Sequence, residues 1–137
     1  MTGPVSDRKQ MIALMAPVQR PGRYHFCTLK NPADAAGLLA AALGSFHEAE
    51  GLSLILTEEQ AAAAGLSTDH PMACLTLTVH SSLEGVGLTA AVARALADEG
   101  IACNMVAAFH HDHAFVPYAK AARALKVLQA AARSAAG

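Results

Sequence analysis

The stretch that decides the fold is residues 86–106, which read VGLTAAVARALADEGIACNMV. Apolar residues recur every three or four positions over Leu88–Glu99, which predicts an amphipathic helix with one buried face. Gly100 predicts the end of that helix, because glycine readily adopts the backbone conformation that terminates one. The apolar run Ile101–Ala108 follows at once and predicts a strand. The stretch therefore predicts a helix that leads directly into a strand.

The flanking sequence extends this unit on both sides. Before the helix, Met72–His80 alternates apolar and polar residues near its end, as a half-buried strand does, and Ser81–Gly87 predicts a loop. After it, His110–His113 predicts a tight connection and Ala114–Tyr118 a strand. A last helix with an apolar stripe is predicted over Ala119–Ala132. The predicted order is strand, helix, strand, strand, helix.

The first part of the chain predicts the same order with weaker helices. Tyr24–Leu29 is rich in strand-forming residues, and Pro32–Leu43 follows as a helix with a proline in its first turn. Two strands, Ser45–Ala49 and Leu52–Leu56, precede a short helix over Glu58–Ala64 that opens with a capping box. The sequence thus predicts an α+β fold built from two similar halves.

These halves give the expected domain organisation, which is an N-terminal helical segment 1–20, a first half 21–68 and a second half 69–137. The N-terminal segment predicts a helix over Ser6–Ala16 that ends before Pro17, with Ser6 as its N-cap. The last residues, Arg133–Gly137, form a poor strand, so the second half has no obvious closing strand at its C-terminus. The strand that begins at Met72 could serve both halves.

Composition and charge argue against several functions. The chain has 137 residues, of which 53% are hydrophobic and 15% charged, and its net charge is −1. This balance supplies a core but no basic face able to neutralise several phosphates, which argues against a nucleic-acid partner. No apolar run reaches the ~20 residues of a membrane span, which argues against a membrane partner. The three cysteines have no paired spacing, which favours a reduced, cytoplasmic setting.

Residues 86–106 resemble the core of an ACT domain and are most similar to the ACT repeats of aspartate kinases. Two wider segments, His80–Ala90 and His111–Pro117, resemble a bacterial family of stand-alone tandem ACT-like proteins once described as a domain of unknown function. The resemblance implies two ferredoxin-like βαββαβ halves, each an antiparallel sheet with its helices packed on one face. It also implies a homodimer that binds a small molecule, by analogy an amino acid. The sequence has no nucleophile elbow, Walker loop or dinucleotide fingerprint, so we expect neither catalysis nor a cofactor.

A ligand site is predicted where the loop of the second half enters the helix at Leu88. Backbone amides at a helix N-terminus bind carboxylates, and Gly87 lets a ligand approach the backbone. The resemblance places Asn104 beside this loop, where it or Glu84 would take the ammonium group. We expect Gly87→Val to obstruct the site and spare the fold, provided that Gly87 needs no positive φ. The predicted ligand-binding residues are Ser81, Ser82, Leu83, Glu84, Val86, Gly87, Leu88 and Asn104.

The histidine run His110–His113 permits two interpretations. Imidazole and carboxylate groups bind zinc and other transition metals, so a small metal-dependent enzyme is one alternative function. Neighbouring strand residues point to opposite faces, so at most His111 and His113 share one, and we expect a structural role in a hairpin instead. We therefore expect no metal site and no catalytic residues. The other alternative is a dimeric interaction protein whose ligand site is vestigial.

Overall fold

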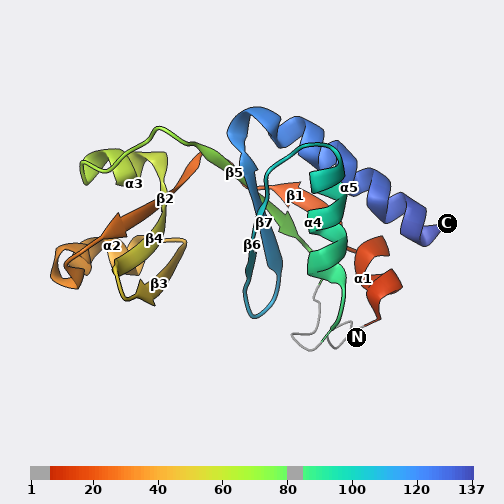
Figure 1. The fold of residues 1–137 in the computed structure, drawn as a ribbon, viewed down its shortest axis with the longest axis horizontal. Helices are drawn as coiled ribbons and strands as arrows, with labels where there is room; N and C mark the ends of the chain where they lie inside the picture. The colour runs from red at the N-terminus through yellow and green to blue at the C-terminus, as the bar shows by residue number, and fades with distance from the viewer. Residues whose placement is uncertain (1–6, 80–84) are drawn as a thin grey trace. The chain divides into compact units, whose positions relative to one another are not determined.

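The structure is a computed structural model that describes residues 7–79 and 85–137 of the chain. The chain divides into two units, whose elements are drawn in Figure 1. One, called here the continuous unit, is Pro21–Met72, and the other, called the split unit, combines Met1–Arg20 with Ala73–Gly137. Both follow the order strand, helix, strand, strand, helix, as the sequence predicts.

The continuous unit is built on an antiparallel sheet in the order β3-β4-β2. Its central strand, β4, pairs with a neighbour along both edges, and this explains why β4 is the most apolar strand of the unit. The elements are β2 (Tyr24–Leu29), a 3-10 turn (Pro32–Ala35), α2 (Ala36–Ala41), β3 (Gly44–Glu48), β4 (Gly51–Thr57) and α3 (Glu58–Ala63).

The core of the continuous unit lies on one face of this sheet. Leu52, Leu54 and Leu56 alternate along β4, so their side chains point the same way. They pack with Ala35 of the 3-10 turn and Ala61 of α3, which places the helical segments on that face. Burial of a leucine side chain stabilises a fold by about 1.5–3 kcal/mol, and β4 supplies all three leucines that are fully buried in this cluster.

Side-chain caps start the short helices of the continuous unit. The predicted capping box is confirmed: the Gln60 amide donates to Thr57 Oγ1 at 3.2 Å, and the Thr57 amide donates to Gln60 Oε1 at 2.9 Å. Asn31 accepts a hydrogen bond from the Ala33 amide, which starts the 3-10 turn before α2. The side-chain amide of Gln60 also donates to the Ala41 carbonyl, so one residue both caps α3 and ties it to the end of α2.

Two helices of the split unit are longer than those of the continuous unit, and its strand order is β1-β5-β7-β6. The pairs β1–β5 and β6–β7 are antiparallel. No helix within the described ranges has both the length and the hydropathy of a membrane span. The elements are α1 (Arg8–Ala13), β1 (Pro17–Gln19), β5 (Met72–Leu77), α4 (Leu88–Asp98), β6 (Asn104–Ala107), β7 (Asp112–Pro117), a 3-10 turn (Tyr118–Lys120) and α5 (Ala121–Ala136).

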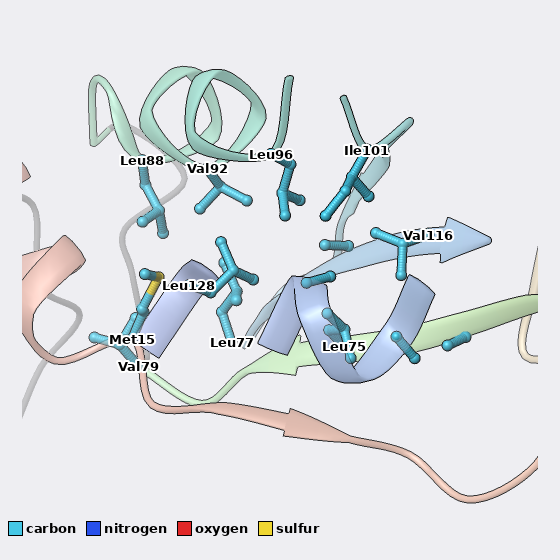
Figure 2. Packing of buried hydrophobic residues seen from close by; sticks show 14 of the residues in the cluster. Met15, Leu75, Leu77, Val79, Leu88, Val92, Leu96, Ile101, Val116 and Leu128 are labelled. Carbon is cyan, nitrogen blue, oxygen red and sulfur yellow. The ribbon is translucent and has the colours of Figure 1, made fainter. Parts of the chain in front are cut away.

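The core of the split unit lies between its helices and one face of its sheet. Figure 2 shows Leu88, Val92 and Leu96 of α4 pointing toward side chains of β5 and toward Leu128 of α5. These three residues recur along one side of α4, so the amphipathic helix predicted from the sequence is confirmed. Met15, from the N-terminal part of the chain, is fully buried in the same cluster. The N-terminal segment is therefore part of this core.

The closing strand of the split unit comes from the N-terminal side of the chain. The sequence predicts no strand after Pro17, but β1 pairs there with β5, and Val18 lies opposite Thr76. The Arg20 amide donates to the Cys74 carbonyl at 2.9 Å, which continues the pairing beyond β1. Three residues beginning with proline are too short to show an alternating pattern, and this is why the strand escaped prediction.

Several predicted boundaries move by a few residues. Ser6 and His80 lie outside the described residues, and the side chain that caps α1 is Asp7, which accepts a hydrogen bond from the Gln10 amide at 3.0 Å. The strand predicted from Ile101 begins only at Asn104, because the Ile101 amide donates to the Leu96 carbonyl at 3.0 Å and so belongs to the end of α4. With these corrections the fold class is the predicted one, α+β with two ferredoxin-like halves.

Candidate functional site

The described part of the predicted ligand site is the start of α4. Gly87 is the N-cap residue, and no side chain among the described residues caps the helix. The first-turn amides of a helix have no partner within the helix, so here they can receive an external carboxylate. Val86 precedes them with 81% of its surface exposed, whereas Leu88 is buried in the core. Ser81, Ser82, Leu83 and Glu84 lie outside the described residues.

Glycine is favoured at position 87 by its backbone conformation, and the side chain of Arg8 lies close to it. Its φ is +109°, a conformation that residues with a side chain rarely adopt. A Cβ atom there would also lie 2.4 Å from Cδ of Arg8, whose side chain crosses the start of α4. The condition attached to Gly87→Val is therefore not met. We expect that substitution to strain the backbone as well as obstruct the site, so it cannot test ligand binding.

Asn104 lies away from the start of α4. It is the exposed first residue of β6, opposite Phe115 of β7, and it follows the C-terminal end of α4 along the chain (Figure 1). α4 has 11 residues and therefore separates its two ends by about 16 Å. The carboxylate and ammonium of a free amino acid share one carbon atom. The structure thus does not bring Asn104 next to Val86 and Leu88 for one zwitterion to contact both.

The histidine run is spread over a turn and the start of β7. The ring of His110 stacks edge-on against Phe109, whereas Nδ1 of His113 lies 2.9 Å from Oγ1 of Thr76 on β5. Burial and the nearby Arg20 guanidinium lower the pKa of His113, which keeps its imidazole neutral at pH 7. In the ranges the structure describes, no three histidine, cysteine or acidic side chains converge as a metal site would require.

The cysteines show no sign of activation as nucleophiles. Cys27, Cys74 and Cys103 are free, and burial raises the pKa of each thiol. A reactive cysteine needs a lowered pKa so that it carries the thiolate at neutral pH. Cys74 Sγ lies 4.0 Å from Nδ1 of His113, but it is fully buried. This arrangement favours a small apolar packing role for the thiol.

Two features of the structure were not singled out by the sequence. In the continuous unit, His25 is only 2% exposed and its Nε2 lies 3.0 Å from Oε1 of Glu58, the first residue of α3. In the split unit, α1, α4 and α5 border a groove of about 480 Å³ that holds Arg8, Lys9 and Arg94. The lysine and arginines give no motif in the sequence, because helices from distant parts of the chain bring them together.

Comparisons with known proteins identify the fold. Residues 5–73 match one ACT domain model, and residues 69–130 match a second. A Vibrio cholerae protein of unknown function, described as a possible transport protein, is 44% identical with a TM-score of 0.78, and the match covers 88% of this chain and 92% of that one. No curated protein matches the chain.

Two more distant structures share the fold alone. The regulatory subunit of aspartate kinase from Thermus thermophilus, in a ligand-free form, is 13% identical with a TM-score of 0.63, and the match covers 84% of this chain and 95% of that one. An Agrobacterium tumefaciens protein is 19% identical with a TM-score of 0.65, covering 85% of this chain and 87% of that one. Two family models that follow one another along the sequence, and a close relative of nearly equal length, lead to one conclusion. The chain belongs to the ACT domain family and carries two ACT domains in tandem.

Proposed function

We propose that this chain is a non-catalytic regulatory module that senses a small molecule, specifically an amino acid, whose carboxylate binds at the start of α4. The observation that carries the proposal is the first turn of α4, which begins at a glycine and has no side-chain cap from the part of the chain that the structure describes. A carboxylate there would accept hydrogen bonds from backbone amides and meet the positive end of the helix dipole. The similarity in fold to an aspartate kinase regulatory subunit supports a regulatory role.

The chemistry of the described residues fits sensing better than catalysis. All three thiols have raised pKa values, and the thiol that lies near a histidine, Cys74 beside His113, is fully buried, so none of the described cysteines is set up as a nucleophile. The proposal includes a cytoplasmic location, which the three free cysteines support. It leaves Asn104 out of the carboxylate contact, because of its place at the other end of α4.

A second candidate is a dimeric interaction module with a vestigial ligand site. Phe46 is 72% exposed and Phe26 is 50% exposed, and their pairing with β4 places both on the sheet face opposite the core of the continuous unit. Exposed aromatic side chains on a sheet face are typical of protein interfaces. We propose that the chain is a homodimer under either candidate, and sedimentation of a monomer at micromolar concentration would exclude this.

The ligand proposal is tested by a thermal-shift screen of the standard amino acids, followed by calorimetry with the strongest candidate. A ligand that binds only the native protein raises its melting temperature. Val86→Asp then places a carboxylate beside the first-turn amides, where it should compete with the ligand and weaken binding about tenfold or more. Val86→Asn is the matched control, because it has the same shape without the charge.

Two outcomes of this experiment would contradict the ligand proposal. Val86 is exposed, so neither substitution should lower the melting temperature of the free protein. If both variants bind the amino acid as tightly as the parent, the site is elsewhere. If no amino acid shifts the melting temperature, the vestigial-site candidate replaces this one.

A further inference from the structure

The groove between α1, α4 and α5 has an apolar floor and a basic rim. Its volume of about 480 Å³ lies within the ~300–1,000 Å³ of typical small-molecule sites. The positions that α4 contributes recur every three or four residues, so they form one side of the helix. Small residues on α4 and α5 keep the floor open. The groove is lined by Arg8, Lys9, Ile12, Gly87, Ala90, Ala91, Arg94 and Ala135.

The position of Arg8 at this groove depends on Gly87. The aliphatic part of Arg8 lies where a Cβ on residue 87 would be, with its Cγ 2.9 Å and its Cδ 2.4 Å from that point. Any side chain at position 87 would therefore move Arg8. The glycine thus serves two purposes, since it starts α4 with a positive φ and it leaves room for a basic side chain across the helix start.

The described residues give the groove a positive charge. Among the described residues, no carboxylate lies within ion-pair distance of Arg8 or Lys9. The carboxylate near Arg94 is that of Asp98, at 3.8 Å, and both side chains are largely exposed. An exposed pair of this kind is worth at most about 1 kcal/mol, so an incoming anion can replace it. Three cationic side chains thus border one groove, and none of the described residues that line it carries a carboxylate.

From this geometry we propose that the α1–α4 groove binds a small organic anion, with its carboxylate or phosphate groups at Arg8, Lys9 and Arg94 and its aliphatic body on the alanine floor. The site goes beyond the proposed amino-acid site, with which it shares only Gly87. Its ligand needs no ammonium group, and the three cations disfavour one. Succinate has the required features, since it carries a carboxylate at each end of a short aliphatic chain.

The test is a titration of the full chain with succinate, followed by two-dimensional amide NMR. Saturable shifts should gather at residues 8–12, 87–94 and 135, and the apparent affinity should fall as salt concentration rises. Inorganic phosphate is a second probe that carries the charge without the aliphatic body, and it should bind the same residues more weakly. Putrescine, a diamine of similar length, is the probe of opposite charge and should give no such shifts.

Variants then assign the charges. Arg8→Gln combined with Arg94→Gln should weaken succinate binding about tenfold, because two favourable charge contacts are lost. Arg123→Gln is the matched control, since Arg123 is also an exposed helical arginine with an acidic partner, Glu99 at 3.1 Å, and does not line the groove. It should change binding less than about twofold.

The outcomes are decisive in either direction. Shifts confined to the groove, with affinity lost in the double variant and kept in the control, would support the proposal. Equal affinity in the double variant and the control, shifts elsewhere, or no saturable shifts would overturn it. The result does not depend on the amino-acid screen, because succinate carries no ammonium group and the NMR shifts report the groove residues directly.

Discussion

The two units share one order of helices and strands but differ in the length of their helices and in how much of each helix is buried. In the split unit α4 has 11 residues and α5 has 16, and both bury apolar residues along one side. In the continuous unit α2 and α3 have six residues each, and α2 buries none of them. Since helices this short gain little from their own hydrogen bonds, the continuous unit depends on β4 and on side-chain caps. One topology can thus be held by helix packing or by strand pairing and capping.

The largest expected effect tests this difference through the cores. Leu96 on α4 and Leu54 on β4 are both fully buried, and each lies in the main cluster of its unit. Leu96→Ala and Leu54→Ala should each reduce the free energy of unfolding by about 2–5 kcal/mol, through lost burial and the cavity that remains.

Hydrogen exchange should show that each substitution loosens its own unit first. Leu39→Ala, at an exposed position on α2, is the control and should change stability by less than about 0.5 kcal/mol. If Leu54→Ala opened the amides of α4 as strongly as those of β4, the two cores would not be separate, and the comparison between the units would fail.

An intermediate effect compares one glycine from each unit. Gly51 and Gly87 have φ of +151° and +109°, so alanine at either position is strained, at about 1–3 kcal/mol. A Cβ on Gly51 would lie 2.6 Å from the Leu29 carbonyl oxygen, which belongs to a paired strand, whereas a Cβ on Gly87 would meet the flexible side chain of Arg8.

Gly51→Ala should therefore destabilise the protein more than Gly87→Ala, as chemical denaturation would measure. Adding Arg8→Ala to Gly87→Ala should recover part of the loss, since it removes the clash and leaves only the φ strain. A double variant as unstable as the sum of the single ones would show that Arg8 is not held against Gly87.

The smallest effect is a pH dependence located in the split unit. The pKa of His113 is lowered by burial, by Arg20 and by His111, and raised to a lesser degree by Asp112. A histidine with a lowered pKa in the folded state binds a proton more readily when unfolded. Above the unfolded pKa of 6.5 the imidazole is neutral in both states, so it does not lower the free energy of unfolding. As the pH decreases below 6.5 the unfolded state takes up the proton first, so stability falls until the pH has passed below the folded pKa.

His113→Gln should flatten this decrease when the melting temperature is followed from pH 7.5 to pH 5 by about half a unit at a time. His47→Gln, which replaces an exposed histidine on β3 of the continuous unit, is the control and should leave the curve unchanged. A curve that is the same in all three proteins would mean that another group causes the decrease.

The sequence was informative wherever a pattern is local. The apolar spacing from Leu88 to Leu96 and the capping box at Thr57 each fix a helix within a few residues, and the structure confirms both. β1 was missed because its three residues carry no period, and its strand character comes only from the pairing with β5. A local pattern could not supply that pairing.

The candidate site was predictable only in part for the same reason. Gly87 before an amphipathic helix indicates an open helix start, and the structure places it there. The distance of Asn104 from that start depends on the direction in which α4 and β6 run, which is a property of the tertiary fold. The groove residues Arg8 and Arg94 are far apart in sequence, and only the packing of α1 near α4 brings them to one place.

The pairing of β1 with β5 has a consequence for how the two units share their stability. The Thr78 hydroxyl donates a hydrogen bond to the Ala16 carbonyl, 62 positions earlier in the chain. The whole continuous unit is therefore the loop of a long-range hairpin. When that unit is folded, Tyr24 pairs with Met72 and holds the ends of the loop together. When it unfolds, the hairpin must close a flexible loop, at an entropic cost on the order of 4 kcal/mol. A ligand that stabilises one unit will therefore also raise the free energy of unfolding of the other, through chain connectivity alone.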